Sequence, residues 1–229
     1  MNVAIIAAAG TGTRMAGKRP KQFLELSGTP IIFHTLKPFE LCDSIHEIIL
    51  VLPAAESADF LSLANQAGLR KLTRVVAGGQ TRAESVYRGL LAIRSATAEI
   101  VAVHDGVRPF VSSSEIKRTI EAAQANGAAV LVAPVTNTIK EISGGEVVRT
   151  LDRANLRHSL TPQCFRFDLL RRAYDGIDVQ DPSLTDDSVL VERLGIKVRA
   201  VEGSSRNIKI TTQEDLQVAE GLLKGVSSQ

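Results

Sequence analysis

The stretch Val3-Ala4-Ile5-Ile6-Ala7-Ala8-Ala9-Gly10-Thr11-Gly12 joins an apolar run to a glycine-rich loop. Residues 3–9 have the length of a strand and no polar side chain, which is typical of a strand buried on both faces of a parallel sheet. Glycines at positions 10, 12 and 17 let the following backbone turn sharply and bring its N–H groups close to an anion. Cations then gather within a short span, at Arg14, Lys18, Arg19 and Lys21. The stretch therefore predicts a buried first strand that ends in a polyphosphate cradle.

Two familiar phosphate-binding patterns come close to this loop without matching it. Residues 12–18 fit a P-loop, but Arg19 stands where a Ser or Thr would ligate Mg²⁺. A dinucleotide fingerprint requires Gly or Ala at position 15, where Met15 stands. Both patterns are therefore disfavoured, and a plain glycine-rich turn with solvated charges is the alternative to the cradle.

Composition limits the class of protein. The chain has 229 residues, enough for one domain over 1–229, and its net charge of only +2 argues against a nucleic-acid partner. Aromatic residues make up 4% and Trp is absent, so a base-stacking platform is not expected. No run is long enough to cross a membrane, and Cys42 and Cys164 have neither zinc-site nor disulfide-framework spacing. We expect core thiols and a cytoplasmic, reducing location.

Apolar runs and amphipathic segments alternate along the chain. Strands are expected at 3–9, 47–52, 72–77, 99–104, 128–134, 197–201 and 207–210. Helices are expected at 30–40, 55–67, 82–94 and 184–194. A further helix is expected to begin with a capping box formed by Ser112 and Glu115 and to end at Gly127. A final helix is expected after a cap at 211–214. This alternation predicts an α/β fold, a Rossmann-like three-layer sandwich with a mostly parallel sheet.

Two strand ends after the first one carry further candidate ligands. Gly78-Gly79 precedes a helix that starts near Arg82, a junction suited to an anion or a ribose. Asp105 and Arg108 share the turn after the strand at 99–104, where Asp105 could hold a metal or hydroxyl and Arg108 a phosphate, unless the two form a local ion pair. His104 lies on the apolar strand itself and is expected to be a satisfied core histidine.

Residues 136–152 break the rhythm. Two short β-type runs flank Ser143-Gly144-Gly145, which is a hairpin pattern. Because an isolated two-stranded ribbon is only marginally stable, it should pack against something, such as a second subunit.

No nucleophile–base pattern is visible in the chain, so hydrolysis through a covalent intermediate has little support. The remaining chemistry is positioning and charge neutralisation, as in phosphoryl and nucleotidyl transfer.

Several motifs together carry a resemblance to a known family. In order they are Ala8-Ala9-Gly10 through Arg14-Met15 to Pro20-Lys21-Gln22-Phe23, Ala77-Gly78-Gly79 with Arg82-Ala83-Glu84-Ser85-Val86, His104-Asp105-Gly106-Val107-Arg108-Pro109, Thr138-Ile139-Lys140, Asp152-Arg153, Leu160-Thr161-Pro162-Gln163, Thr185-Asp186-Asp187 and Asn207-Ile208-Lys209. Over nearly the whole chain this set resembles the 2-C-methyl-D-erythritol 4-phosphate cytidylyltransferases.

The resemblance implies a homodimeric enzyme of the non-mevalonate isoprenoid pathway, which uses Mg²⁺ or another divalent cation to transfer CMP from CTP to methylerythritol phosphate. It implies catalytic roles for Arg14 and Lys21. It implies nucleotide contacts at Ala8, Ala9, Gly10, Gly79, Ser85 and Asp105, with Asp105 also serving the metal. It implies sugar-phosphate contacts at Arg108, Thr138, Arg153, Thr161, Thr185 and Lys209, of which Thr138 and Arg153 would reach the neighbouring subunit from a dimerisation arm at 136–152.

Some positions depart from the family pattern. Asn137 stands where an Asp is common, Arg157 where a Trp is common, and Gln80-Thr81 where an acidic pair is frequent. These departures bear on substrate contacts and not on the reaction class. Ribitol-5-phosphate cytidylyltransferase is a related alternative, although Thr138-Ile139-Lys140 and Thr185-Asp186-Asp187 favour methylerythritol phosphate. A nonenzymatic nucleotide-binding module, or an RNA-binding module using the basic run at 14–21, is the alternative of a different class.

Overall fold

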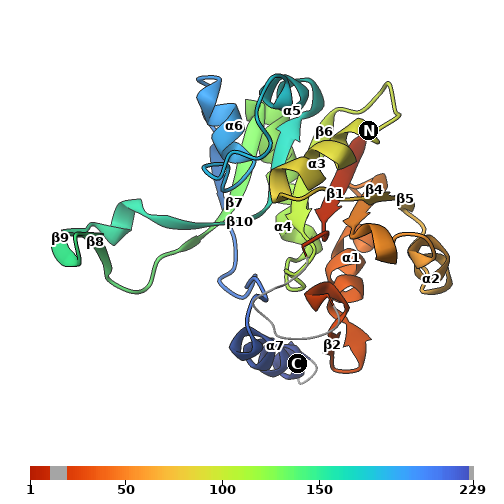
Figure 1. Cartoon of the computed structure of the whole chain (residues 1–229), viewed down its shortest axis with the longest axis horizontal. Coiled ribbons are helices and arrows are strands. Elements are labelled where there is room, and N and C mark those ends of the chain that lie inside the picture. Colours follow the sequence, from red (N-terminus) through yellow and green to blue (C-terminus); the bar gives the residue numbers. More distant parts are fainter. Residues whose placement is uncertain (11–19, 227–229) are drawn as a thin grey trace.

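The computed structural model describes residues 1–10 and 20–226. Its centre is a seven-stranded sheet in the order β11-β7-β10-β6-β1-β4-β5 (Figure 1). The strands are β1 (Asn2–Ala7), β4 (Glu47–Leu52), β5 (Leu72–Ala77), β6 (Ile100–Asp105), β7 (Ala128–Pro134), β10 (Arg157–Arg166) and β11 (Arg199–Glu202). All neighbouring pairs are parallel except those that β10 makes with β6 and β7. The predicted mostly parallel sheet is confirmed.

Helices cover both faces of the sheet. They are α1 (Ile31–Leu41), α2 (Phe60–Gln66), α3 (Arg82–Leu91), α4 (Ser113–Asn126), α5 (Phe167–Tyr174), α6 (Ser188–Arg193) and α7 (Gln213–Val226), with short 3-10 turns η1 (Lys21–Phe23), η2 (Ala54–Glu56) and η3 (Arg153–Asn155). Strand β1 shows how the layers form, because Ala4 and Ile6 pack with α1, α2 and α4, whereas Ile5 packs with α3, α5 and α6. The three-layer α/β sandwich predicted from the sequence is therefore present.

A third, smaller apolar cluster lies beside these layers. Leu216 and Ala219 of α7 pack against Leu26 of β2 (Glu25–Leu26), which pairs with β3 (Thr29–Pro30). Val107 belongs to the same cluster and lies in the turn after β6. The cluster therefore packs helix α7 against strand β2 and against the turn after β6.

The hairpin predicted at 136–152 consists of β8 (Ile139–Ser143) and β9 (Glu146–Leu151). Gly144 and Gly145 form its turn with φ of 59° and 85°, a conformation that favours glycine. The hairpin leaves the sheet after β7 and returns as β10, so it projects between two neighbouring antiparallel strands (Figure 1). We call residues 136–156 the arm.

Several local predictions were wrong. The expected helix at 55–67 is a 3-10 turn followed by the shorter α2, and the helix expected from 184 begins only at Ser188. Residues 207–210 form no strand, because their backbone bonds to turns and to Val107 instead of a neighbouring strand. Strand β10 and helix α5 were not predicted at all. The ends of α4 were predicted correctly, since Ser112 and Glu115 form the capping box and Gly127 ends the helix with φ of 88°.

Candidate functional site

A cavity of about 470 Å³ opens where the carboxyl ends of β1, β5 and β6 meet. This edge of a parallel sheet is where ligands bind in open α/β folds. The cavity is lined by Ala7, Ala8, Ala9, Gly10, Lys21, Gln22, Gly79, Gln80, Thr81, Arg82, Ser85, Asp105, Val107 and Lys209. Eight predicted site residues are thus brought together, namely Ala8, Ala9, Gly10, Lys21, Gly79, Ser85, Asp105 and Lys209.

The floor of the cavity is closely packed backbone. The Ala8 N–H donates to the Val51 carbonyl at 2.8 Å, and the Gly106 N–H donates to the Ala7 carbonyl at 2.8 Å. A Cβ added at Gly106 would lie 2.4 Å from the Cβ of Ala8, so only glycine fits there. Small residues at this strand end therefore let the backbone of β1 and the turn after β6 pack closely against each other.

The corner after β5 is held by its own side chains. The Gly79 N–H donates to Ser85 Oγ at 3.1 Å, and Ser85 Oγ donates to the Thr81 carbonyl at 2.9 Å. The Gln80 N–H donates to a carboxylate oxygen of Glu84 at 2.8 Å, and this bond is the main reason that the pKa of Glu84 is lowered. Two amides expected to face an anion are therefore already bonded within the protein, and the corner contributes shape to the cavity.

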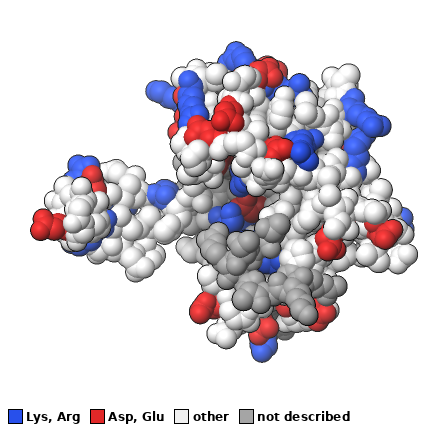
Figure 2. Space-filling model, viewed as in Figure 1, with Lys and Arg blue, Asp and Glu red and all other residues white. Residues whose placement is uncertain are grey.

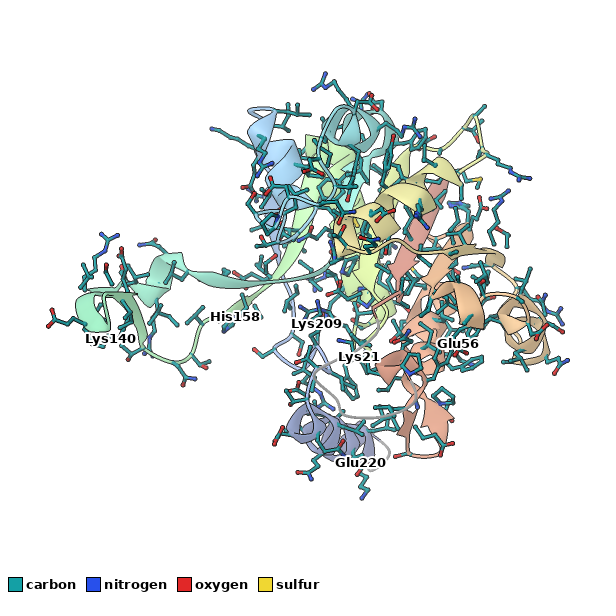
Figure 3. The ribbon with its side chains drawn as sticks, in the orientation of Figure 1. Lys21, Glu56, Lys140, His158, Lys209 and Glu220 are labelled. Atoms are coloured by element: carbon teal, nitrogen blue, oxygen red, sulfur yellow. The ribbon has the colours of Figure 1, made fainter. Side chains whose placement is uncertain are left out.

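Two lysines from distant parts of the chain line the cavity. Lys21 lies in η1, and the neighbouring Gln22 fixes that turn because its Nε2 donates to the Ala8 carbonyl at 2.6 Å. Lys209 lies before α7, and its Nζ is 2.9 Å from Asp105 Oδ2. Figure 3 shows Lys21 and Lys209 near each other at the centre of the molecule, whereas Lys140 lies far out on the arm.

Asp105 is the electrostatic centre of the site. Its carboxylate meets Arg82 Nε at 2.9 Å, Arg108 Nε at 3.2 Å and Lys209 Nζ at 2.9 Å. Burial alone would raise the pKa of Asp105, but Arg82, Lys209 and Arg108 together hold that pKa well below its usual range. The local Asp105–Arg108 pair considered from the sequence is thus part of a larger ion cluster. Figure 2 shows basic and acidic atoms together in the hollow at the centre of this face.

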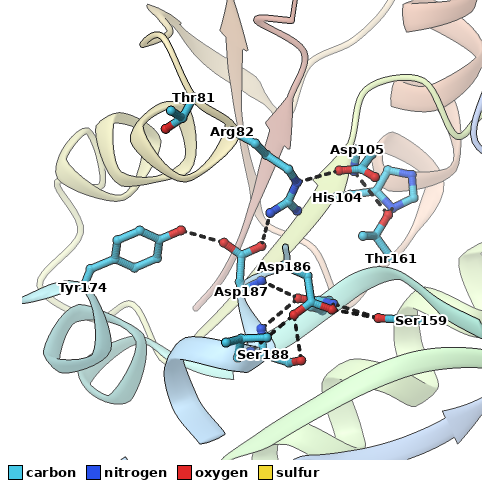
Figure 4. Close-up of polar contacts among 12 residues, drawn as sticks. Thr81, Arg82, His104, Asp105, Ser159, Thr161, Tyr174, Asp186, Asp187 and Ser188 are labelled. Atoms are coloured by element: carbon cyan, nitrogen blue, oxygen red, sulfur yellow. Dashed lines mark hydrogen bonds and ion pairs between the residues drawn. The ribbon is translucent and has the colours of Figure 1, made fainter. Parts of the chain in front are cut away.

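Arg82 lines the cavity, although the sequence did not place it among the predicted site residues. Its guanidinium bridges Asp105 and the buried Asp187, which also accepts a hydrogen bond from the Tyr174 hydroxyl at 2.6 Å (Figure 4). Burial alone would lower the pKa of Arg82, yet Asp187 and Asp105 raise it above the ordinary value. One signal was available: a cation in the first turn of a helix opposes the helix dipole and so calls for a carboxylate partner.

Thr161 lies behind the cavity instead of inside it. Its hydroxyl is within 2.9 Å of His104 Nδ1 and accepts a hydrogen bond from the Asp105 N–H at 3.2 Å, and the residue is 4% exposed. Thr161 therefore supports the backbone at Asp105 and is not part of the cavity lining, and its contact with the sugar phosphate stays a prediction. His104 is fully buried and also bonds the Arg108 carbonyl at 3.0 Å, as expected for a core histidine. Burial lowers the pKa of His104 to about 4.

The remaining predicted residues lie elsewhere. Arg108 is mostly buried and pairs with the Asp105 carboxylate. Its Nη1 also donates to the Asn207 carbonyl at 2.8 Å. Thr138 and Arg153 are exposed on the arm, and Arg153 donates to the Thr136 carbonyl there. Thr185 is exposed on the turn before α6. Arg14 lies outside the described residues.

The donor set suits a divalent cation held mainly by a ligand. Among the described residues, no three His, Cys, Asp or Glu side chains cluster as a protein-only metal site. Mg²⁺ is commonly held by one or two carboxylates together with water and substrate phosphates. The carboxylate of Asp105 at the cavity wall fits that pattern.

Chemically, the cavity offers cations and backbone around one carboxylate. The cations of Lys21, Lys209 and Arg82 line it, together with the small residues at the end of β1. None of the described lining residues forms a nucleophile–base pair, since His104 is bonded behind the cavity. The arrangement favours a reaction in which charge on phosphate oxygens is stabilised while the substrates supply both reacting groups.

No helix among residues 1–10 and 20–226 combines the length and the apolar character needed to span a bilayer.

Comparison with known proteins agrees over nearly the full length. The family model described as 2-C-methyl-D-erythritol 4-phosphate cytidylyltransferase matches residues 2–225. A protein of that name from Pelotomaculum thermopropionicum is 43% identical, with 96% of this chain and 93% of the relative covered. A second, from Alkaliphilus oremlandii, is 44% identical, covering 96% and 94%.

Solved structures lead to the same family. A 4-diphosphocytidyl-2C-methyl-D-erythritol synthase from Anaerococcus prevotii has a TM-score of 0.82 at 33% identity, covering 97% of this chain and 98% of that one. The 2-C-methyl-D-erythritol 4-phosphate cytidylyltransferase from Thermus thermophilus has a TM-score of 0.78 at 35% identity, covering 96% and 98%. Because the match in sequence and structure spans the cavity and the arm alike, this chain belongs to the 2-C-methyl-D-erythritol 4-phosphate cytidylyltransferase family.

Proposed function

We propose that this chain transfers the cytidylyl group of CTP to 2-C-methyl-D-erythritol 4-phosphate in isoprenoid synthesis, and that the cavity at the ends of β1, β5 and β6 binds CTP. The observation that carries the proposal is the family match over residues 2–225, on a chain whose cavity is lined by Lys21, Lys209 and Arg82 around Asp105. A phosphate oxygen of the sugar phosphate attacks the α-phosphorus of CTP. The bond from that phosphorus to the bridging oxygen breaks, and pyrophosphate leaves with the electron pair.

The protein does not have to provide a nucleophile or a general base for this step, because the acceptor phosphate is already an anion near neutral pH. Lys21 stabilises the charge that develops on the α-phosphate and on the leaving pyrophosphate. Lys209 and Arg108 hold the acceptor phosphate, and both already converge on Asp105. Arg14 shares the task of Lys21, a prediction that comes from the family resemblance.

Mg²⁺ or another divalent cation is part of this proposal. Asp105 would hold it beside the nucleotide phosphates, and the ion would neutralise charge on the phosphate oxygens. Lys209 and Arg108 both contact one oxygen of the Asp105 carboxylate, while Arg82 contacts the other oxygen. We expect the Lys209 side chain to turn from Asp105 toward the acceptor phosphate once both substrates are bound.

We also propose that two copies of the chain assemble through the arm. Ile142, Val147 and Val148 of the hairpin are 56%, 59% and 57% exposed, which is costly for apolar side chains in water. Thr138 and Arg153 are exposed on the same arm and away from the cavity of their own chain. A symmetric pair of arms would cover the apolar residues and carry Thr138 and Arg153 to the acceptor site of the neighbouring copy.

The test is a pyrophosphate-release assay with CTP, Mg²⁺ and one of two acceptors, methylerythritol phosphate or ribitol 5-phosphate. Turnover with the first and little with the second is expected. The reported relatives all have the methylerythritol name, so neither the ribitol enzyme nor a binding module without activity is favoured. Good turnover with ribitol 5-phosphate alone would overturn the choice of acceptor, and CTP binding without turnover on either would overturn the enzymatic function.

The cytoplasmic location expected from the sequence stays a proposal. It is supported by the two cysteines, Cys42 and Cys164, which are both buried free thiols and therefore suit a reducing compartment.

A further inference from the structure

One guanidinium joins two carboxylates from different parts of the fold. Arg82 Nε donates to Asp105 Oδ1 at 2.9 Å, and Arg82 Nη1 donates to Asp187 Oδ2 at 2.8 Å (Figure 4). Asp105 is the last residue of β6 and lines the cavity, whereas Asp187 directly precedes α6 and does not line it. A planar guanidinium can span two acceptors in this way, but the single ammonium of a lysine cannot take both positions.

Asp187 is held firmly without help from Arg82. It is 1% exposed, its Oδ1 accepts the Tyr174 hydroxyl at 2.6 Å, and its N–H donates to Gln163 Oε1 at 2.9 Å. The turn that carries Asp187 also includes Thr185. The carboxylate is therefore a fixed anchor outside the cavity, and Arg82 is the link between this anchor and the cavity wall.

The link decides which oxygen of Asp105 is available to other groups. Arg82 occupies Oδ1, while Arg108 and Lys209 both contact Oδ2. Without an anchored Arg82, the Asp105 carboxylate would be free to rotate toward Lys209 and Arg108 and to neutralise them more completely. Those two cations would then attract the acceptor phosphate less strongly, and the carboxylate would be turned away from the position in which it would hold a divalent cation beside the phosphates of CTP.

Arg82 has a further unused group. Its Nη2 is buried and forms no hydrogen bond with any residue that the structure describes. A guanidinium with one nitrogen left unbonded loses part of its hydrogen-bonding capacity, which costs free energy. This cost indicates that the position of Arg82 is fixed by the two carboxylates and not by complete satisfaction of its own donors.

We propose that Arg82, anchored by Asp187, is a positioning residue that fixes the orientation of the Asp105 carboxylate and so couples the turn at 185–187 to the nucleotide site. The inference rests on the proposed function in one respect, namely that CTP binds in this cavity. Asp187 then influences CTP binding from outside the cavity, and it does so only through Arg82.

The test is a double-mutant cycle with Arg82→Lys, Asp187→Asn and the combination. The main readout is the dissociation constant of CTP, measured by titration calorimetry with Mg²⁺ and without acceptor. Each single substitution is expected to weaken CTP binding about tenfold, and the combined variant to be no weaker than the poorer single one. If the two effects multiply instead, Asp187 does not act through Arg82 and the proposal is overturned.

Two comparisons separate positioning from a loss of folding or of charge. Asp168→Asn is the matched control, because Asp168 is an exposed carboxylate on α5 that pairs with Arg166 and belongs to neither the anchor nor the cavity, so CTP binding is expected to change less than about twofold. An effect as large as that of Asp187→Asn would overturn the proposal, because the loss of any carboxylate would then suffice. If Asp187→Asn does not fold, Arg82→Lys decides alone: full CTP affinity with lysine would show that only charge is needed.

The acceptor reaction provides a second, independent readout. In Arg82→Lys, kcat and KM for methylerythritol phosphate are measured by pyrophosphate release. A raised KM for this acceptor, together with weaker CTP binding, is expected for a residue that couples both halves of the site. If the wild-type chain binds CTP but does not use methylerythritol phosphate, the proposed function is wrong. The double-mutant cycle would still test the coupling of Asp187 to the site through Arg82, because that cycle measures CTP binding alone.

Discussion

The cavity wall and the arm both contain arginine–carboxylate pairs, but in opposite environments. Arg82 and Asp105 are 2.9 Å apart with side chains 25% and 7% exposed. Arg149 and Glu141 pair on the hairpin with side chains 68% and 45% exposed. Low exposure strengthens a charge interaction and makes an unpaired partner costly, whereas water and salt screen an exposed pair. The same residue types therefore organise a reaction site in one region and contribute little in the other.

Of the substitutions that test this difference between the two regions, Lys21→Ala in the cavity is expected to have the largest effect. Replacing Lys21 with Ala removes a cation from the cavity, so kcat should fall by about 10²- to 10³-fold, as when one group that stabilises transition-state charge is lost. Single-turnover pyrophosphate release measures the change. Lys117→Ala is the matched control, because Lys117 is exposed on α4 and pairs with Glu121 one turn along the helix. A Lys21→Ala variant with near wild-type kcat would mean that the lysine contributes only local charge.

The second prediction concerns the arm as part of a neighbouring site. Lys21→Ala and Arg153→Ala chains should each be nearly inactive alone, but a refolded equal mixture should recover about a quarter of wild-type activity. Random pairing makes half of the dimers mixed, and each mixed dimer contains one intact site of two. Activity is measured after mixing, and the oligomeric state by light scattering. If no activity returns although mixed dimers form, Arg153 serves its own chain or no site at all.

How much of each region could be predicted depends on how far apart in the sequence its interacting residues lie. Strands 47–52, 72–77 and 128–134 were predicted with their observed bounds because each is an apolar run, and Asp105 was found because it ends such a run. Strand β10 was missed, since polar Thr161 and Gln163 interrupt its pattern and its register shifts between Ser159 and Gln163.

The link from Arg82 to Asp187 spans 105 residues and had no local signal that named its partner. It exists only because the start of α3 and the turn before α6 meet in the folded chain. The arm shows the reverse case, because Gly144 and Gly145 fix a hairpin through their own turn geometry and nothing distant is needed. Local chemistry was therefore predictable, and the anchoring of the site was not.

The third prediction compares two histidines. Burial lowers the pKa of His104 to about 4 from an ordinary value of 6.5, so the folded chain leaves this ring neutral at a pH where the unfolded chain protonates it. The free energy of unfolding should therefore fall as the pH drops from about 6.5 to 4, by about 3 kcal/mol from His104. Urea unfolding at several pH values measures it.

The matched pair for this measurement is His104→Gln against His158→Gln. The first should flatten the pH dependence between 6.5 and 4, and the second is the control for replacing a histidine that is exposed, on β10 near the arm. Carboxylates titrate in both variants alike, so the difference between the two curves belongs to His104. Identical curves would contradict a neutral, buried His104.

The smallest expected effect is at the exposed pair of the arm. Replacing Arg149 with Gln should change the free energy of unfolding by about 0.5 kcal/mol or less, since exposed ion pairs gain little over solvation and are screened by salt. Urea unfolding at low and high salt measures it, with Glu141→Gln as the partner variant. A loss well above 1 kcal/mol would mean that the pair becomes buried when the arm meets a second copy of the chain. Val147→Asp should disrupt such an interface. In a chain that already contains Val147→Asp, adding Arg149→Gln should then again change the free energy of unfolding by only about 0.5 kcal/mol or less.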